Sequence, residues 1–276
     1  MDITATTSEL VVLGAALVGA GAFAGLLAGM FGIGGGAVIV PVLAELLLVL
    51  GVGDAVHMHV AVGTSLGIIV PTSIRSFRAH QKRGAVDMAL LRSWLLAVPA
   101  GTVIASAVAA FASSGLLKAI YAVMALLFGI KMVFGFQRLR LGDDLPGEPW
   151  RSAVGGVIGF LSTLMGIGGG VLNNTFMTLY GRPIHQAVAT SAGVGTLIAI
   201  PGVIGYVIAG WNSPDLPPLS LGYVNVLGVA LVIPVAFVTA PLGAWIAHRM
   251  SKRHLEMMFG LFLLTVAIRF AIGFMG

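Results

Sequence analysis

A glycine-rich stretch interrupts the hydrophobic sequence of this chain twice. Residues 30–36 read Met-Phe-Gly-Ile-Gly-Gly-Gly, and residues 164–170 read Leu-Met-Gly-Ile-Gly-Gly-Gly. Inside a helix each glycine costs about 1 kcal/mol relative to alanine. Four glycines within five residues therefore mark a deliberate break in a helix. The rest of the chain reads as two halves, each built around one such break.

The composition places these breaks in a membrane protein. Of the 276 residues, 58% are hydrophobic and 9% are charged, whereas soluble domains carry about 25% charged residues. Repeated apolar runs of about 20 residues have the length that crosses a bilayer. We therefore predict an all-α, polytopic integral membrane protein.

Charge and cysteine content exclude several other classes. The net charge of +5 does not indicate nucleic-acid binding, because the basic residues lie in short loops between apolar segments, where they set membrane topology. The chain has no cysteine, which excludes disulfides, thiol nucleophiles and Cys-ligated metals. Residues 1–9 lack the basic start of a cleavable signal peptide, so we expect the first apolar run to stay in the mature protein.

Three further matches, in the same order as the glycine breaks, indicate an internal duplication. They are His59-Val-Ala-Val-Gly-Thr-Ser65 with His185-Gln-Ala-Val-Ala-Thr-Ser191, Pro99-Ala-Gly101 with Pro241-Leu-Gly243, and 117–136 with 255–274. A polar, turn-rich linker separates the two copies. We predict a first membrane repeat over 1–136, a cytoplasmic linker over 137–150 and a second membrane repeat over 151–276, which together form one transporter domain.

Each half reads as five apolar segments. We place them at 10–30, 36–51, 58–77, 88–111 and 115–136, and at 151–165, 170–181, 184–209, 222–247 and 254–275. The second segment of each half is shorter than the roughly 17–25 residues that span a bilayer. These short segments are either half-helices or arms of re-entrant pairs.

The distribution of Lys and Arg predicts that the two halves are inverted. Between the third and fourth segments the first half carries Arg75, Arg78, Lys82, Arg83 and Arg92. The equivalent loop of the second half, 211–221, carries no Lys or Arg and contains Asp215. Equivalent loops should therefore lie on opposite sides. This topology puts the linker in the cytoplasm and both termini outside the inner (plasma) membrane.

Inverted repeats with matched broken helices point to a secondary transporter whose substrate binds where the breaks meet. A broken helix leaves unpaired amide N–H groups at its new N-terminus, and a bound anion can satisfy them. Glycine also lets the anion approach the backbone closely. The candidate glycines are Gly34, Gly35, Gly36, Gly168, Gly169 and Gly170. The alternative is close helix packing through small residues.

The two Gly-Ile-Gly-Gly-Gly breaks, each followed by a His-x-Ala-Val-(Gly/Ala)-Thr-Ser segment, resemble the TauE/SafE sulfite exporter family. The resemblance covers about residues 10–275. It implies a bacterial or archaeal inner-membrane transporter of sulfite, a sulfonate or a related small organic anion, and we expect this transporter to act as an exporter. An anion channel and a transition-metal carrier using Asp54, His57 and His59 remain alternatives. An intramembrane enzyme is disfavoured, because the sequence shows no acid–base or metal constellation.

Polar residues near the breaks complete the candidate substrate site. They are Thr64, Ser65, Asn173, Asn174, Thr190 and Ser191. Hydroxyl groups can donate hydrogen bonds to an oxyanion, although Ser and Thr also bond back to their own helix. The two asparagines align with Ile39 and Val40 of the first half. We therefore expect the two halves to contact the substrate through different chemical groups.

Three titratable residues are candidates for proton coupling. His59 and His185 are matched in the two repeats, and Glu45 is an acidic residue inside an apolar segment. The alternatives are an interfacial helix cap for the histidines and an interfacial position for the carboxylate. The sequence indicates no cofactor, no resident metal and no nucleic-acid partner. It leaves the oligomeric state open, with a homodimer as one option.

Overall fold

The computed structural model describes residues 7–31, 35–135 and 140–273. Within these ranges the chain forms eleven helices and one short antiparallel β-hairpin. The first six helices are α1 (Thr7–Phe31), α2 (Gly36–Val49), α3 (His57–Lys82), α4 (Met88–Ser93), α5 (Ala97–Phe111) and α6 (Ser114–Phe134). The remaining elements are α7 (Trp150–Leu164), α8 (Gly170–Leu179), α9 (Ile184–Ala209), β1 (Ser220–Leu221), β2 (Val224–Asn225), α10 (Val226–His248) and α11 (Lys252–Ile272).

The helical, multi-span architecture expected from the sequence is confirmed. Among the described residues, α3, α6, α9, α10 and α11 are long and apolar enough to cross a membrane. The helices that follow the glycine breaks are short. With 14 residues in α2 and 10 in α8, they extend about 21 Å and 15 Å at a rise of 1.5 Å per residue.

The segment expected over 88–111 is two helices rather than one. Trp94 lies at the turn between α4 and α5, with its side chain fully buried. Its indole Nε1 donates a hydrogen bond of 2.8 Å to the carbonyl oxygen of Arg151, at the start of α7. A buried indole needs such a partner, so a tertiary contact holds the turn.

Two other boundaries differ from the expectation. Helix α3 continues to Lys82, so Arg75 and Arg78 lie on a helix rather than in a loop. The segment expected to begin at residue 222 opens with the β-hairpin, and α10 starts at Val226. The side chain of Asn225 caps α10 by accepting a hydrogen bond from Gly228 N, as asparagine commonly does at this position.

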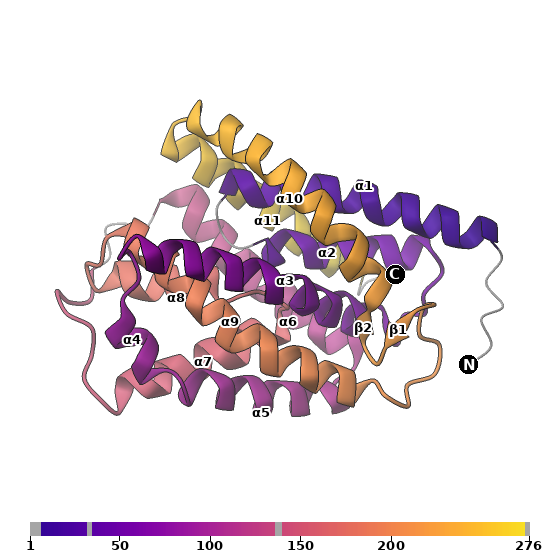
Figure 1. Cartoon of the computed structure of the whole chain (residues 1–276), viewed down its shortest axis with the longest axis horizontal. Coiled ribbons are helices and arrows are strands. Elements are labelled where there is room, and N and C mark those ends of the chain that lie inside the picture. Colours follow the sequence, from indigo (N-terminus) through magenta and orange to yellow (C-terminus); the bar gives the residue numbers. More distant parts are fainter. Residues whose placement is uncertain (1–6, 32–34, 136–139, 274–276) are drawn as a thin grey trace.

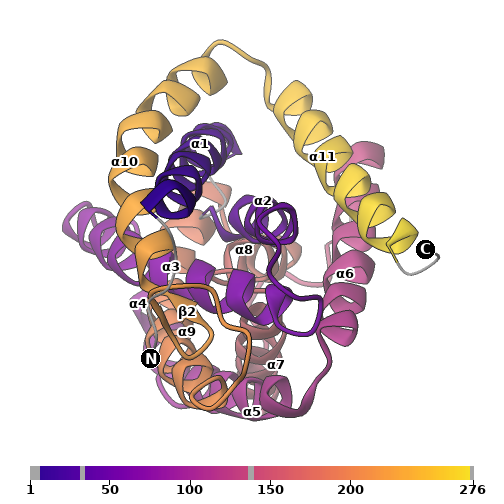
Figure 2. The same ribbon diagram turned by 90° about the vertical axis from the view of Figure 1, so that its right-hand side faces the viewer.

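The helices pack in pairs around a central pair (Figures 1 and 2). Helices α3 and α9 lie against each other at the centre, α1 packs against α10, α5 against α7, and α6 against α11. Glycines bring two of these pairs close together. A Cβ at Gly101 would meet the Gly156 carbonyl oxygen, and one at Gly243 would meet the Leu26 carbonyl oxygen. The matched Pro-x-Gly motifs thus make equivalent contacts, α5 with α7 and α10 with α1.

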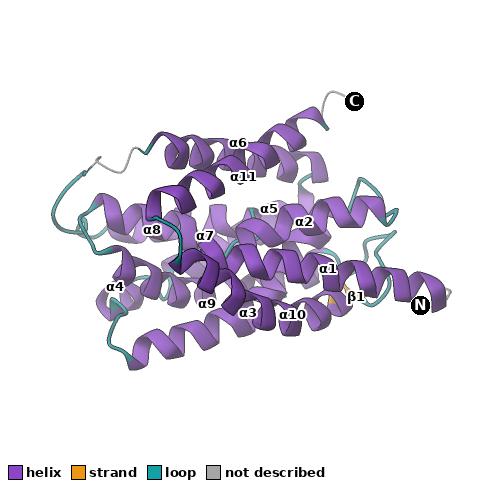
Figure 3. Ribbon diagram, turned by 90° about the horizontal axis from the view of Figure 1, so that it is seen from above, coloured by secondary structure: helices purple, strands orange, loops and turns teal. Residues whose placement is uncertain are grey.

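The connections gather at two opposite ends of the bundle. The β-hairpin and the start of α1 lie at one end, and α4 lies at the other (Figures 1 and 3). Contacts at the α4 end join Trp94 to Arg151, and Arg182 of the loop after α8 to Asp144 of the linker at 3.6 Å. Together with Arg92 in the last turn of α4, these contacts place basic residues from both halves of the chain at the α4 end.

Candidate functional site

The two glycine breaks touch each other in the folded chain. A Cβ at Gly36 would lie 2.6 Å from the Gly166 carbonyl oxygen and 2.9 Å from Ile167 Cα. Gly35 (φ 71°), Gly166 (φ 64°) and Gly169 (φ 72°) adopt positive φ, which side chains disfavour. Gly34 lies outside the described residues. The glycines thus allow both the reversal of the chain and the contact between the breaks.

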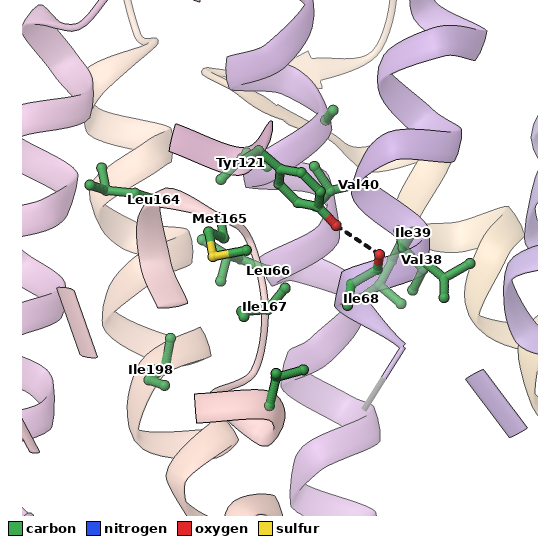
Figure 4. Close-up of a cluster of buried hydrophobic side chains, with 14 of the residues drawn as sticks. Val38, Ile39, Val40, Leu66, Ile68, Tyr121, Leu164, Met165, Ile167 and Ile198 are labelled. Carbon is green, nitrogen blue, oxygen red and sulfur yellow. Dashed lines mark hydrogen bonds between the residues drawn. The ribbon is translucent and has the colours of Figure 1, made fainter. Parts of the chain in front are cut away.

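Buried hydrophobic side chains close around this contact. A Cβ at Gly36 would lie 3.0 Å from Ile69 Cδ1, and one at Gly168 would lie 3.2 Å from Ile69 Cγ2. Ile69, on α3, is only 2% exposed. Figure 4 shows Val38 to Val40 of α2 and Leu164, Met165 and Ile167 of the second break in one cluster of buried hydrophobic side chains. We call this arrangement, in which Gly36 contacts Gly166 and Ile167, the closed contact.

Both short helices begin at the closed contact. The first helical hydrogen bonds of α2 run from Val38 N and Ile39 N to Gly35 O, at 2.9 Å each. In α8 the corresponding bond runs from Asn173 N to Gly169 O at 2.8 Å. The N–H groups that come before these bonded ones in each helix have no acceptor within the helix. Two positive helix ends are thereby directed to one region of the protein.

The matched serines take part in different interactions. Ser65 of α3 donates a hydrogen bond of 2.8 Å to the Gly166 carbonyl oxygen and so holds the second break directly. Ser191 of α9 instead joins the two asparagines of α8. It accepts from Asn173 Nδ2 at 2.7 Å and donates to Asn174 Oδ1 at 2.8 Å. The structure therefore brings three of the predicted polar residues together on the second half.

The matched threonines hold helix caps. Thr64 Oγ1 accepts a hydrogen bond from Asn225 N at 2.9 Å, and Thr190 Oγ1 accepts one from Asp87 N at the same distance. Asn225 is the N-cap of α10, and Asp87 is the N-cap of α4. Each threonine thus anchors a helix start that comes from the other half of the chain.

The three titratable candidates lie in unlike surroundings. His59 is buried, its Nε2 lies 3.1 Å from the carbonyl oxygens of Ala109 and Ala112, and its ring packs on Tyr223. His185 is exposed. Glu45 pairs with Arg269 of α11 at 2.9 Å. The sequence match between the two histidines does not extend to their environments.

Sequence reasoning missed two residues beside the breaks. Tyr121 of α6 is fully buried and donates a hydrogen bond of 2.7 Å to the Ala37 carbonyl oxygen, in the first turn of α2 (Figure 4). A tyrosine inside an apolar segment was the available signal, because a buried phenol needs a partner. Ser162, in the last turn of α7, is fully buried, and its Oγ has no hydrogen-bond partner among the described residues.

The metal-carrier alternative rested on Asp54, His57 and His59. His57 Nδ1 lies 3.0 Å from the Asp54 carbonyl oxygen, whereas His59 Nε2 bonds to the end of α5. Residues two apart on a helix do not share a face. In the part of the chain that the structure describes, no three His, Cys, Asp or Glu residues group closely enough to hold a metal ion.

Comparison with known proteins identifies the family. Residues 17–270 match the family model described as "Sulfite exporter TauE/SafE". The chain belongs to the TauE/SafE family. This TauE/SafE chain is therefore a multi-pass membrane protein of a transporter family, with α3, α6, α9, α10 and α11 as its long apolar spans.

Several relatives resemble the TauE/SafE chain over nearly its whole length. It is 35% identical to a "Probable membrane transporter protein" of Haemophilus influenzae over 249 residues, which cover 90% of this chain and 94% of that protein. A probable membrane transporter protein of Methanocaldococcus jannaschii is 30% identical over 258 residues, covering 91% and 92%. The protein YunE of Bacillus subtilis, with the same description, is 28% identical over 269 residues, covering 91% and 94%. No solved structure matches the chain.

Proposed function

We propose that this chain is a secondary transporter that exports a small anion, such as sulfite, a sulfonate or a related organic anion, by alternating access. The observation that carries the proposal is the closed contact of Gly36 with Gly166 and Ile167. Two helix N-termini and two glycine-rich turns meet there. That combination suits an anion, because amide N–H groups and helix dipoles both favour negative charge.

The closed contact also suggests how transport works. Gly36 lies too close to the Gly166 carbonyl oxygen to admit even a methyl group. An anion can therefore reach the first-turn amides of α2 and α8 only when these segments separate. We propose that α2 with its break and α8 with its break move apart during each transport cycle, and that the closed contact re-forms between substrates.

Matched contacts in the two halves support the proposed inverted repeats. Thr64 anchors the start of α10, and Thr190 anchors the start of α4. We propose that residues 1–136 and 151–276 are the two repeats, that the linker 137–150 is cytoplasmic, and that the repeats rock against each other. Equivalent contacts in inverted halves would let the two repeats exchange conformations. That exchange would give the inward-open and outward-open states of alternating access.

The charge distribution supports an orientation in the inner (plasma) membrane with both termini outside. Basic residues from both halves gather at the end of the bundle that carries α4, and such residues favour the cytoplasm. An inside-negative potential drives an anion outward by about 2.3 kcal/mol per charge per 100 mV. Export then needs no coupling ion. Proton coupling through His59, His185 or Glu45 remains a prediction.

We propose that the substrate-binding residues divide into two groups. Those that meet the anion are the break glycines, including Gly34, together with Ser65, Asn173, Asn174 and Ser191. Thr64 and Thr190 position the helices around the site through their bonds to the caps of α10 and α4. This division follows from the location of their partners. The threonine hydroxyls bond to helix caps, whereas Ser65 and Ser191 bond to the second break and to α8.

A flux screen tests the proposal. The purified protein is placed in liposomes, and uptake of labelled sulfite, thiosulfate, alkanesulfonates and small carboxylates is measured with and without an applied potential. We expect saturable uptake of at least one of these anions, accelerated by an inside-positive potential. Uptake of none of them above empty liposomes would contradict the proposal.

A further inference from the structure

The neighbours of Asn173 determine which way its side-chain amide is oriented. Its Nδ2 lies 2.7 Å from Ser191 Oγ, 3.4 Å from the Ala187 carbonyl oxygen and 3.5 Å from Met177 Sδ. The carbonyl and the thioether are acceptors without a proton, so the opposite orientation would place oxygen against oxygen. The proton of Ser191 is donated to Asn174 Oδ1. Ser191 therefore accepts from Asn173, and Asn173 Oδ1 points away from α9.

That oxygen has no donor in the part of the chain that the structure describes. Asn173 is 0% exposed, and its Oδ1 is a buried atom without a hydrogen-bond partner. The neighbouring Asn174 Oδ1 is satisfied by Ser191. Buried polar atoms of native proteins nearly always have a partner, and an exception calls for an explanation. Only an N–H, an O–H or a cation can satisfy a carbonyl-type oxygen.

Asn173 lies in the first turn of α8, directly after the second break. Asn173 follows Gly169 and Gly170 by one turn, so these residues share a helix face. Helical side chains lean toward the N-terminus and cover the preceding turn, which here consists of bare glycine. A second unpaired atom, Ser162 Oγ, belongs to α7, which contacts the same break. Ser162 lies on the α7 face of Ile158, and Ile158 Cγ2 would be 3.8 Å from a Cβ at Gly169.

We propose that the second break selects anions that also carry a hydrogen-bond donor, and that Asn173 Oδ1 accepts that donor. The inference rests on the proposed function, because it assigns a specificity to the same site. First-turn amides of α8 and the Ser162 hydroxyl bind the negative group, and Asn173 binds a hydroxyl, an amine or the proton of a singly protonated oxyanion. Ile39 matches Asn173 in the first half and offers no acceptor. Asn173 is thus a specificity-determining residue.

Matched anion pairs test this inference in liposomes that contain the full chain. The pairs are 2-hydroxyethanesulfonate with ethanesulfonate, and glycolate with acetate, each differing by one hydroxyl group. We expect wild type to transport the hydroxylated member of a pair with about tenfold higher efficiency, because the other member leaves Asn173 Oδ1 unsatisfied. Asn173→Leu has a similar size and no acceptor, so the ratio should fall to about one.

Met177→Leu is the matched control. It removes the contact of Asn173 Nδ2 with Met177 Sδ at nearly constant volume, but keeps Asn173 Oδ1 and the bond from Asn173 to Ser191, so the ratio should persist even if the absolute rate falls. Asn173→Ala is measured beside Asn173→Leu, and thermal melting confirms that each variant is folded. Equal transport of both members by wild type would overturn the inference, as would a ratio that survives in either Asn173 variant. Failure to transport any of the four anions would instead contradict the proposed function for sulfonates and carboxylates.

Discussion

Substituting Gly36 by alanine perturbs the closed contact at one atom. The added Cβ would lie 2.6 Å from the Gly166 carbonyl oxygen, where an ordinary contact begins at 3.4 Å. The backbone must therefore shift by about 0.8 Å. Overpacking of this kind typically destabilises the packed state by about 1–3 kcal/mol. Because the contact exists only while the breaks touch, the penalty falls on the closed arrangement. At 1.4 kcal/mol per tenfold, the closed-to-separated ratio should fall about 5- to 150-fold.

Cysteine accessibility measures this shift directly, because the chain has no cysteine of its own. Ile69 packs on Gly36 and is nearly inaccessible, so a single cysteine introduced by Ile69→Cys should react with a maleimide only when the breaks separate. In the Gly36→Ala background we expect the labelling rate to rise at least about fivefold. Gly19→Ala is the control, since Gly19 lies on α1 and its Cβ would meet nothing within 4 Å.

Two outcomes would contradict a gating role for the closed contact. If Gly36→Ala left both the labelling rate and the melting temperature unchanged, the closed contact would not be as tight as described. If the melting temperature fell while labelling stayed at the wild-type rate, the contact would serve packing alone. In that case the glycines would be explained by close approach of helices, and the gating role would be wrong.

Four further outcomes follow from the contacts. Gly35→Val and Gly169→Val should abolish transport while the protein still folds, because each adds a side chain to a break that is proposed to bind the anion. Gly51→Ala should transport normally in the same flux assay, because Gly51 also has positive φ (80°) but lies away from the breaks with open space around it. Ser65→Ala should lower stability by about 0.5–1.5 kcal/mol by removing the bond to Gly166 O, measured by melting, and no change would contradict that bond. Glu45→Gln and Arg269→Gln should each change stability by less than about 1 kcal/mol, because the pair is partly exposed, and loss of transport in Glu45→Gln alone would favour proton coupling. In intact cells a cysteine from Asn212→Cys should be labelled from outside and one from Gln81→Cys only after permeabilisation; the reverse pattern would contradict the orientation.

Most helix positions could be predicted from the sequence, because apolar runs in a membrane protein have few other outcomes. The short helices α2 and α8 begin at the residues that close the glycine stretches, since a run of glycines ends a helix wherever it occurs. The break between α4 and α5 was not predictable. It depends on where the Trp94 indole finds a partner, and that partner, Arg151, comes from the other half of the chain.

The contacts of the candidate site residues could be predicted only in part, and their binding of a substrate stays a prediction. The repeated motif indicated Ser65 and Ser191, and the structure places their hydroxyls in contact with the second break and with α8. It could not distinguish Ser65 from Thr64, because neighbouring residues of one helix point to different sides and only the packed structure shows which side meets the caps. Ser162 and Tyr121 were missed for a related reason. Their roles depend on the faces of α7 and α6 that turn toward the breaks.

In the proposed mechanism the two glycine breaks form one anion site that opens alternately to each side of the membrane. A counterflow assay distinguishes this mechanism from a continuous pore. Liposomes containing the protein are loaded with an unlabelled anion that the flux screen has identified, diluted into trace labelled anion, and followed for accumulation of label with the membrane potential clamped to zero. Alternating access predicts transient accumulation above equilibrium in wild type and its loss in Gly169→Val. Equilibration without overshoot would contradict alternating access and indicate a channel-like anion conductor.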